Sequence, residues 1–135
     1  MKAQTAFEYM IIVMIILGFL APIWYYMFQV KGSTSDTFIL TYAKSAASEI
    51  AENADLVYSQ RYDAQVVVDV YLPPGIQNTS ISGNEIRMTV YTTQGIQEVF
   101  EETSAQLQGT IPATEGRHRV LIRANGNYVE ISQLE

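Results

Sequence analysis

The distribution of hydrophobic and polar residues divides this chain into a long apolar segment and an alternating remainder. From Tyr9 to Val30, 22 consecutive residues carry no charged side chain. As a helix this segment is about 33 Å long, close to the ~30 Å hydrocarbon core of a bilayer. We expect it to lie in lipid or to pack against other apolar helices, with a kink near Gly18 to Pro22 because proline removes a backbone hydrogen bond.

A second helical pattern follows the apolar segment. Its apolar residues recur at intervals of three and four, and the charged residues Lys44, Glu49, Glu52 and Asp55 fall off that stripe. The small residues of the stripe suit close packing against a sheet. The stripe consists of Ile39, Ala43, Ala46, Ile50, Ala54 and Val57.

The polar stretch between the two patterns leaves two possibilities open. Gly32 ends the first helix and Ser33, Ser35 or Asp36 caps a second one, or a single helix continues through a weakened spot. Taken together, the two patterns predict one long helix from Gln4 to about Ser59, on the order of 80 Å in length.

Alternation with a period of two replaces the helical pattern after Arg61. It predicts five to seven short antiparallel strands, separated by Pro and Gly turns, with the amphipathic helix across one face of the sheet. The fold class is therefore α+β: a long hydrophobic N-terminal helix at 4–60 and a small antiparallel β-rich head domain at 61–135. The expected strands cover residues 65–72, 79–81, 86–91, 96–101, 106–111, 119–123 and 128–131.

A short motif stands directly before the apolar run. Gln4-Thr5-Ala6-Phe7-Glu8-Tyr9 follows the basic Lys2, and Glu8 places a carboxylate where burial without a partner is expensive. The motif and its position resemble the class III signal peptide of archaeal type IV pilins. The resemblance implies that residues 1–3 are a leader, which a prepilin peptidase removes by cleaving between Ala3 and Gln4. The helix then stays on the mature protein, with Glu8 as its fifth residue. A Gly often precedes the Gln in that family, where this chain has Ala3.

The β-rich half is similar to the head domain of the same family. The similarity rests on Pro73-Pro74-Gly75-Ile76, on Ser82-Gly83-Asn84 and on Gly126-Asn127-Tyr128-Val129-Glu130-Ile131. Together the resemblances imply a pilin-like structural subunit that is inserted in the cytoplasmic membrane and then assembled into an extracellular adhesive filament. The implied partners are further copies of the chain, the peptidase, an assembly ATPase and a membrane platform protein. The residues expected to serve assembly are Glu8, Tyr9, Ile15, Leu17, Pro22 and Trp24.

Three alternatives remain open at this point. A single-pass anchored surface domain explains the apolar length, and Lys31 marks one interface, but it gives no role to Glu8. A minor pilin fits the same pattern. A bacterial Tad-type relative also has a Glu-Tyr pair before an apolar helix.

The remaining composition argues against catalysis. The chain has no Cys, which excludes disulfides and thiolate sites, and its net charge of −6 with scattered basic residues predicts no nucleic-acid partner. His118 is the only His, and Glu101 and Glu102 are expected to point apart on a strand or turn as solvated charges. We therefore expect no enzyme activity, cofactor or metal. Asn78-Thr79-Ser80 fits the N-glycosylation pattern, in a predicted turn.

Overall fold

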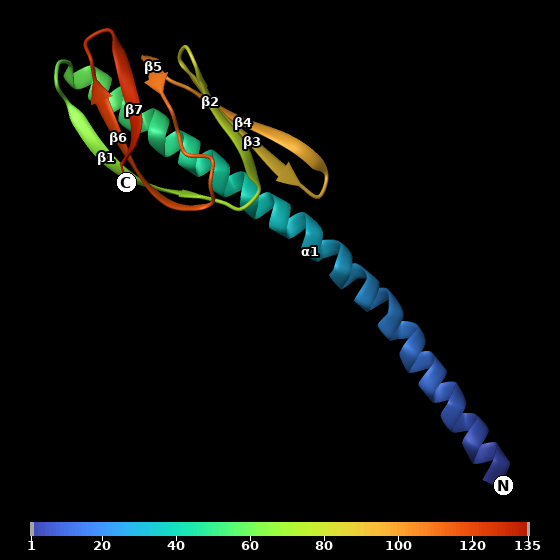
Figure 1. Cartoon of the computed structure of the whole chain (residues 1–135). Coiled ribbons are helices and arrows are strands. Elements are labelled where there is room, and N and C mark those ends of the chain that lie inside the picture. The colour runs from blue at the N-terminus through green and yellow to red at the C-terminus, as the bar shows by residue number, and fades with distance from the viewer. Residues whose placement is uncertain (1, 135) are drawn as a thin grey trace. The chain divides into compact units, whose positions relative to one another are not determined.

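One helix and seven strands make up the part of the chain that the structure describes. The computed structural model describes the backbone of residues 2–134 and the side chains of residues 4–31 and 34–134. The predicted α+β class is confirmed, because a long N-terminal helix precedes a small β domain (Figure 1). The elements are α1 (Lys2–Gln60), β1 (Gln65–Leu72), β2 (Ile76–Ser82), β3 (Glu85–Thr92), β4 (Gly95–Glu102), β5 (Gln106–Gly109), β6 (Gly116–Ala124) and β7 (Tyr128–Leu134).

Helix α1 belongs to two compact units, one ending at Ser35 and the other beginning at Asp36. The helix continues through Pro22 and Gly32, so the possibility that Gly32 ends it is wrong. Two hydroxyl groups near Gly32 bond backward along the helix: Thr34 Oγ1 donates to the Val30 carbonyl at 2.9 Å, and Ser35 Oγ donates to the Lys31 carbonyl at 3.1 Å. Both side chains thus bond within the continuing helix and cap no new one.

The strands form two sheets, whereas the alternation suggested one. The larger sheet has the order β1-β6-β7-β5, and the smaller has the order β2-β3-β4. All neighbours are antiparallel except β5 and β7, which pair in parallel. The predicted antiparallel β-rich head is therefore confirmed, with this one parallel pair as an exception. Because β7 lies between two strands that run in opposite directions, it must be parallel to one of them.

Several strand boundaries also differ from the prediction: β6 begins at Gly116 instead of Arg119, and β7 ends at Leu134 instead of Ile131. β2 begins at Ile76 instead of Thr79, with an irregularity between Ile76 and Asn78 where it pairs with β3. β5 ends at Gly109 instead of Ile111. At Gly109 φ is +115°, and a Cβ atom there would come within 1.9 Å of the Ile131 carbonyl oxygen, so only glycine fits this close approach.

The core of the second unit lies between the helix and both sheets. Ala43, Ala46, Ile50, Ala54 and Val57 of the predicted stripe are buried, while Ile39 is only half-buried. Ala47 and Ala51 are buried as well, which widens the stripe of small residues beyond the prediction. The strand residues of this core are Val68, Val70, Leu72, Ile86, Met88, Leu107, Val120, Ile122, Ala124, Val129 and Ile131.

Polar contacts join the same helical segment to the turns and to β4. The carboxylate of Asp36 is buried and accepts hydrogen bonds from the backbone N–H and the hydroxyl of Thr93. The carboxylate of Asp55 accepts the backbone N–H of Ser104 at 2.8 Å. Asp36 therefore bonds to the turn between β3 and β4, and its predicted alternative role as a helix cap is wrong.

Candidate functional site

The first unit presents apolar side chains on every side of its helix. Nineteen large hydrophobic residues between Phe7 and Val30 are exposed, each to between 41% and 73%. A helix that is apolar all round is stable only when it is surrounded by lipid or by other apolar surfaces. The segment is long and apolar enough to span a membrane, by length and composition.

The residues predicted to serve assembly lie along this helix and do not converge on one point. Tyr9, Ile15, Leu17 and Trp24 are all exposed, and Pro22 lies within the helix. The Trp24 ring lies 6.3 Å, centroid to centroid, from the ring of Phe28 at a tilted angle. These rings line a shallow depression of about 150 Å³ together with Met27 and Lys31.

The residues at the predicted cleavage position are only partly described. Gln4 is exposed within α1, whereas the side chain of Ala3 lies outside the described residues. Glu8 is exposed, and it has no ion pair among the side chains described. Its charge therefore has no counter-ion within the described part of a single copy of this chain.

The glycosylation pattern lies in a strand, not in the turn that the sequence suggested. Asn78 is an exposed residue of β2, directly after the irregularity in the pairing of β2 with β3. The neighbouring Thr79 is half-buried, and its hydroxyl donates to the Ile111 carbonyl at 2.6 Å. Glycosylation of Asn78 stays a prediction, on an accessible side chain.

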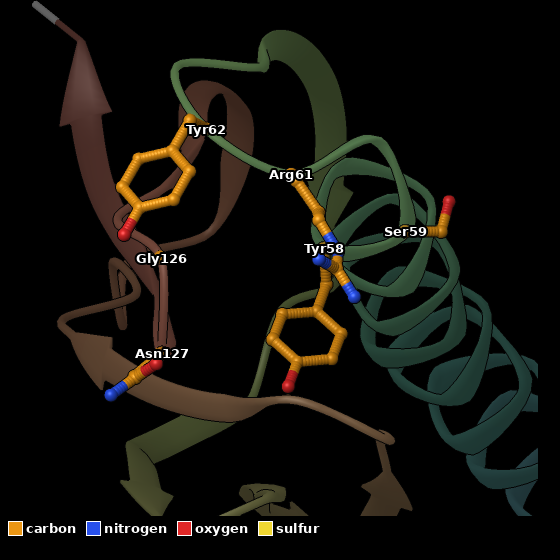
Figure 2. Close-up of a pocket in the computed structure, with 6 residues that line it drawn as sticks. All are labelled: Tyr58, Ser59, Arg61, Tyr62, Gly126 and Asn127. Carbon is orange, nitrogen blue, oxygen red and sulfur yellow. The ribbon is translucent and has the colours of Figure 1, made fainter.

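The second unit contains a cavity of about 610 Å³ that sequence reasoning missed. It forms where the end of α1, the loop between α1 and β1 and the turn between β6 and β7 meet (Figure 2). The sequence feature that could have indicated this cavity is the pair Tyr58 and Tyr62, four residues apart at the end of the helix. The cavity is lined by Tyr58, Ser59, Arg61, Tyr62, Gly126 and Asn127.

The loop that carries this cavity has an unusual backbone. Arg61 and Asp63 adopt left-handed φ angles of 59° and 67°, which residues other than glycine seldom do. The Asp63 carboxylate lies 3.0 Å from the Arg123 guanidinium. Tyr62, between them, packs its ring against Gly126, where an added Cβ would lie 3.3 to 3.4 Å from ring and hydroxyl atoms.

Three polar groups at the cavity have no partner among the residues that the structure describes. Among the described residues, nothing forms a hydrogen bond or an ion pair with the side-chain polar atoms of Tyr58, Arg61 or Tyr62. Ser59, in contrast, donates its hydroxyl to the Leu56 carbonyl at 2.7 Å. The two phenols and the guanidinium are therefore available to a bound molecule.

Two of the polar residues weighed for catalysis, His118 and Glu101, have structural contacts. His118 contacts Thr114 through Nε2 and Gln133 through Nδ1. Glu101 and Glu102 do point apart, but Glu101 is not merely solvated. Its carboxylate accepts the Ser48 hydroxyl at 3.0 Å and lies 3.8 Å from Lys44 Nζ, so it joins β4 to the helix.

Comparison with protein-family models, with curated proteins and with solved structures finds no match for this chain. Two features of its own structure therefore carry the functional interpretation. They are the apolar surface of the first unit and the cavity of the second.

Proposed function

We propose that this chain is a type IV pilin-like subunit that polymerises through its N-terminal helix into an extracellular filament used for adhesion. The observation that carries the proposal is the apolar surface around α1 between Phe7 and Val30. Fully burying a large apolar side chain contributes about 1.5–3 kcal/mol. Association costs about 4–15 kcal/mol in lost freedom of motion, so full burial from water of about two to ten of the 19 exposed side chains offsets it.

An open polymer follows from how identical copies bury such a surface. Apolar helices of many copies bury one another in a bundle, and contacts related by a rotation that does not close produce a helical filament. Before assembly, we propose that the subunit is held in the cytoplasmic membrane, where lipid covers the same apolar surface. A prepilin peptidase, an assembly ATPase and a membrane platform protein are the partners this route requires.

Glu8 supplies the element of specificity in this proposal. Cleavage before Gln4 creates an α-amino group, and in a staggered bundle that group of one copy approaches Glu8 of a neighbour. A buried ion pair adds little net stability because desolvation opposes the attraction, but it disfavours every register that leaves either charge unpaired. The pair thus fixes the axial position of an incoming subunit.

A membrane-anchored surface domain is the second candidate. The observation in its favour is that α1 contains a segment of the length and composition needed to cross a bilayer. A minor pilin or a Tad-type pilin would share the same architecture. The anchor differs from the filament subunit in one respect that is easily tested, since its helix never leaves the lipid.

Electron microscopy separates these candidates. Material sheared from the cell surface is examined by negative stain, and its subunits are identified by mass spectrometry. We expect filaments that contain this chain, with an intact mass that lacks Met1 to Ala3. Recovery of the chain only from the membrane fraction would refute the filament. Filaments with the three residues retained would refute the cleavage alone.

A further inference from the structure

We propose that the cavity at the end of α1 binds a saccharide that carries a single carboxylate. This proposal rests on the adhesive role proposed above and gives it a ligand class. The cavity volume of about 610 Å³ lies within the usual range for small-molecule sites and has room for a disaccharide. All of its lining residues belong to the second unit, so the site is complete within one copy of the head.

The aromatic rings suit the body of a sugar. Tyr58 is partly exposed and Tyr62 is 84% exposed, so both rings offer apolar area with a phenol hydroxyl at the edge. Aromatic side chains of this kind combine an apolar face with a polar group, which matches the C–H faces and hydroxyls of a sugar ring. In Figure 2, Tyr62 lies beside Gly126, and Arg61 extends from the loop on the side of Tyr58.

Arg61 selects the charge of the ligand. The nearby Asp63 is held by Arg123 at 3.0 Å, and Arg61 has no carboxylate within ion-pair distance among the described residues. A guanidinium group binds carboxylates through two parallel hydrogen bonds. Arg61 is exposed at the cavity, and its guanidinium is therefore available to an acidic group on the ligand.

The backbone at Arg61 supports a role for its side chain. Its φ of 59° is the conformation that commonly ends helices at glycine, and it is strained for any residue with a Cβ. Glycine would fill this position with less strain, yet the chain has arginine there. Strained non-glycine residues concentrate at binding sites, where the side chain has a use that offsets the strain.

The charge of the whole protein limits the ligand further. A net charge of −6 repels a polymer with many negative charges, and this repulsion extends over about 8 Å at physiological salt. One carboxylate per saccharide can be matched by Arg61, whereas a second would meet no free cation of the cavity lining. A singly acidic sugar within an otherwise neutral glycan fits best.

The test uses the full chain in a polyoxyethylene detergent, which contributes neither sugar nor charge. Isothermal titration calorimetry compares cellobiouronic acid, a glucuronyl-glucose disaccharide, with cellobiose, its uncharged counterpart. We expect the acid to bind at least roughly tenfold more tightly than cellobiose, because cellobiose has no carboxylate to form the charged hydrogen bonds with Arg61. Equal binding of the two disaccharides, or no binding of the acid, would overturn the proposal.

Three variants assign the binding to the cavity. Arg61→Gly removes the guanidinium while relieving the backbone strain, so weaker binding by roughly tenfold is not a result of unfolding. Tyr62→Ala should weaken both disaccharides. The control is Arg117→Gln, which removes an equal charge from an exposed position of β6 outside the cavity and should leave binding unchanged.

The outcomes also separate a saccharide from other ligands and from the filament. If Arg117→Gln weakens binding as much as Arg61→Gly, the attraction is non-specific and the site is refuted. If a capped Ala-Glu-Ala peptide binds as tightly as the acid disaccharide, the ligand class is wrong. Because unassembled protein is used, neither result bears on polymerisation, which the microscopy of sheared material decides.

Discussion

The two parts of helix α1 are both α-helical, but the apolar side chains of the first part are exposed and those of the second part are mostly buried. In the part that ends at Ser35, Ile15 is 54% exposed, and apolar side chains occur on all sides. In the part that begins at Asp36, Ile50 is fully buried on a stripe of alanines, and charged residues such as Lys44 and Glu52 lie on exposed faces. The comparison shows that the arrangement of apolar residues around the axis decides what a helix needs as a partner.

Side-chain size follows the same division. The buried stripe of the second part uses Ala43, Ala46, Ala47, Ala51 and Ala54, so a helix can lie close to two sheets of its own chain. The first part uses large Ile, Leu, Met and aromatic residues. Small residues pack within the subunit, and we propose that the large ones pack against lipid and against other copies.

The largest expected effect tests whether the first part is the polymer core. Ile15→Asp places an unpaired charge in an apolar bundle, which costs several kcal/mol per subunit. Leu17→Asp should act in the same way. We expect complete loss of filaments by electron microscopy, with an unchanged thermal unfolding midpoint of the head by circular dichroism.

Glu52→Lys is the matched control for that substitution. Glu52 is an exposed residue of the second part, whereas Asp55 is unsuitable because its carboxylate bonds to Ser104. Filaments should form normally in the Glu52→Lys variant. Normal filaments in cells that carry Ile15→Asp would mean that α1 is not the core of the polymer.

A smaller effect is expected where the first part carries its one acid. Glu8→Ala should reduce filament number while membrane insertion and cleavage remain, because the ion pair that we propose sets the register is lost. Glu8→Gln keeps the shape without the charge and should fail equally, with processed subunit accumulating in the membrane. Filament counts and immunoblots measure both. Full recovery with Gln would show that hydrogen bonding or packing is responsible and not an ion pair.

The same substitution in both parts sharpens the comparison. Ile50→Ala leaves a cavity between the helix and the sheets, and it should lower the unfolding free energy of the head by about 2–5 kcal/mol. Ile15→Ala should leave that free energy unchanged. Urea denaturation of the detergent-solubilised chain, followed by circular dichroism of the β signal, gives both values. A large effect of Ile15→Ala would mean that the first part contributes to the stability of the head.

The smallest effect lies at the boundary between the parts. Asp36→Ala leaves the backbone N–H of Thr93 without its acceptor and should cost about 1–3 kcal/mol of head stability. Ser35→Ala removes only an exposed hydroxyl bonded along the helix and should be neutral. Urea midpoints of the two neighbouring variants provide the comparison. Equal midpoints would show that Asp36 does not tie the helix to the head.

Sequence patterns predicted those features of the fold that depend on a single segment. The stripe from Ala43 to Val57 and the alternation from Gln65 to Leu72 each have a period that reports which face is buried. The division into two sheets and the parallel pairing of β5 with β7 were missed. Alternation reports faces but not neighbours, so pairing between distant strands leaves no periodic signal in either strand.

Of the two candidate sites, the one formed by a single segment was predictable from the sequence and the one formed by distant segments was not. The apolar surface was evident in the sequence because its residues are contiguous between Phe7 and Val30. The cavity was not, because it joins Tyr58, Arg61 and Tyr62 to Gly126, a residue far along the chain. Asp36 was predicted as a possible helix cap because its partner Thr93 lies 57 positions away, so the sequence near Asp36 gives no sign of that bond. Only long-range folding brings such residues together.

The position of β7 has a consequence for the order of events during synthesis. β7 follows every other strand of the larger sheet in sequence, yet it lies inside that sheet, between β6 and β5. Its Val129 and Ile131 are buried in the core. The head therefore cannot close until β7 has left the ribosome, whereas the apolar helix emerges roughly a hundred residues earlier. In the membrane route that we propose, the helix would therefore reach the membrane while the head is still unfolded and able to pass through a translocation channel.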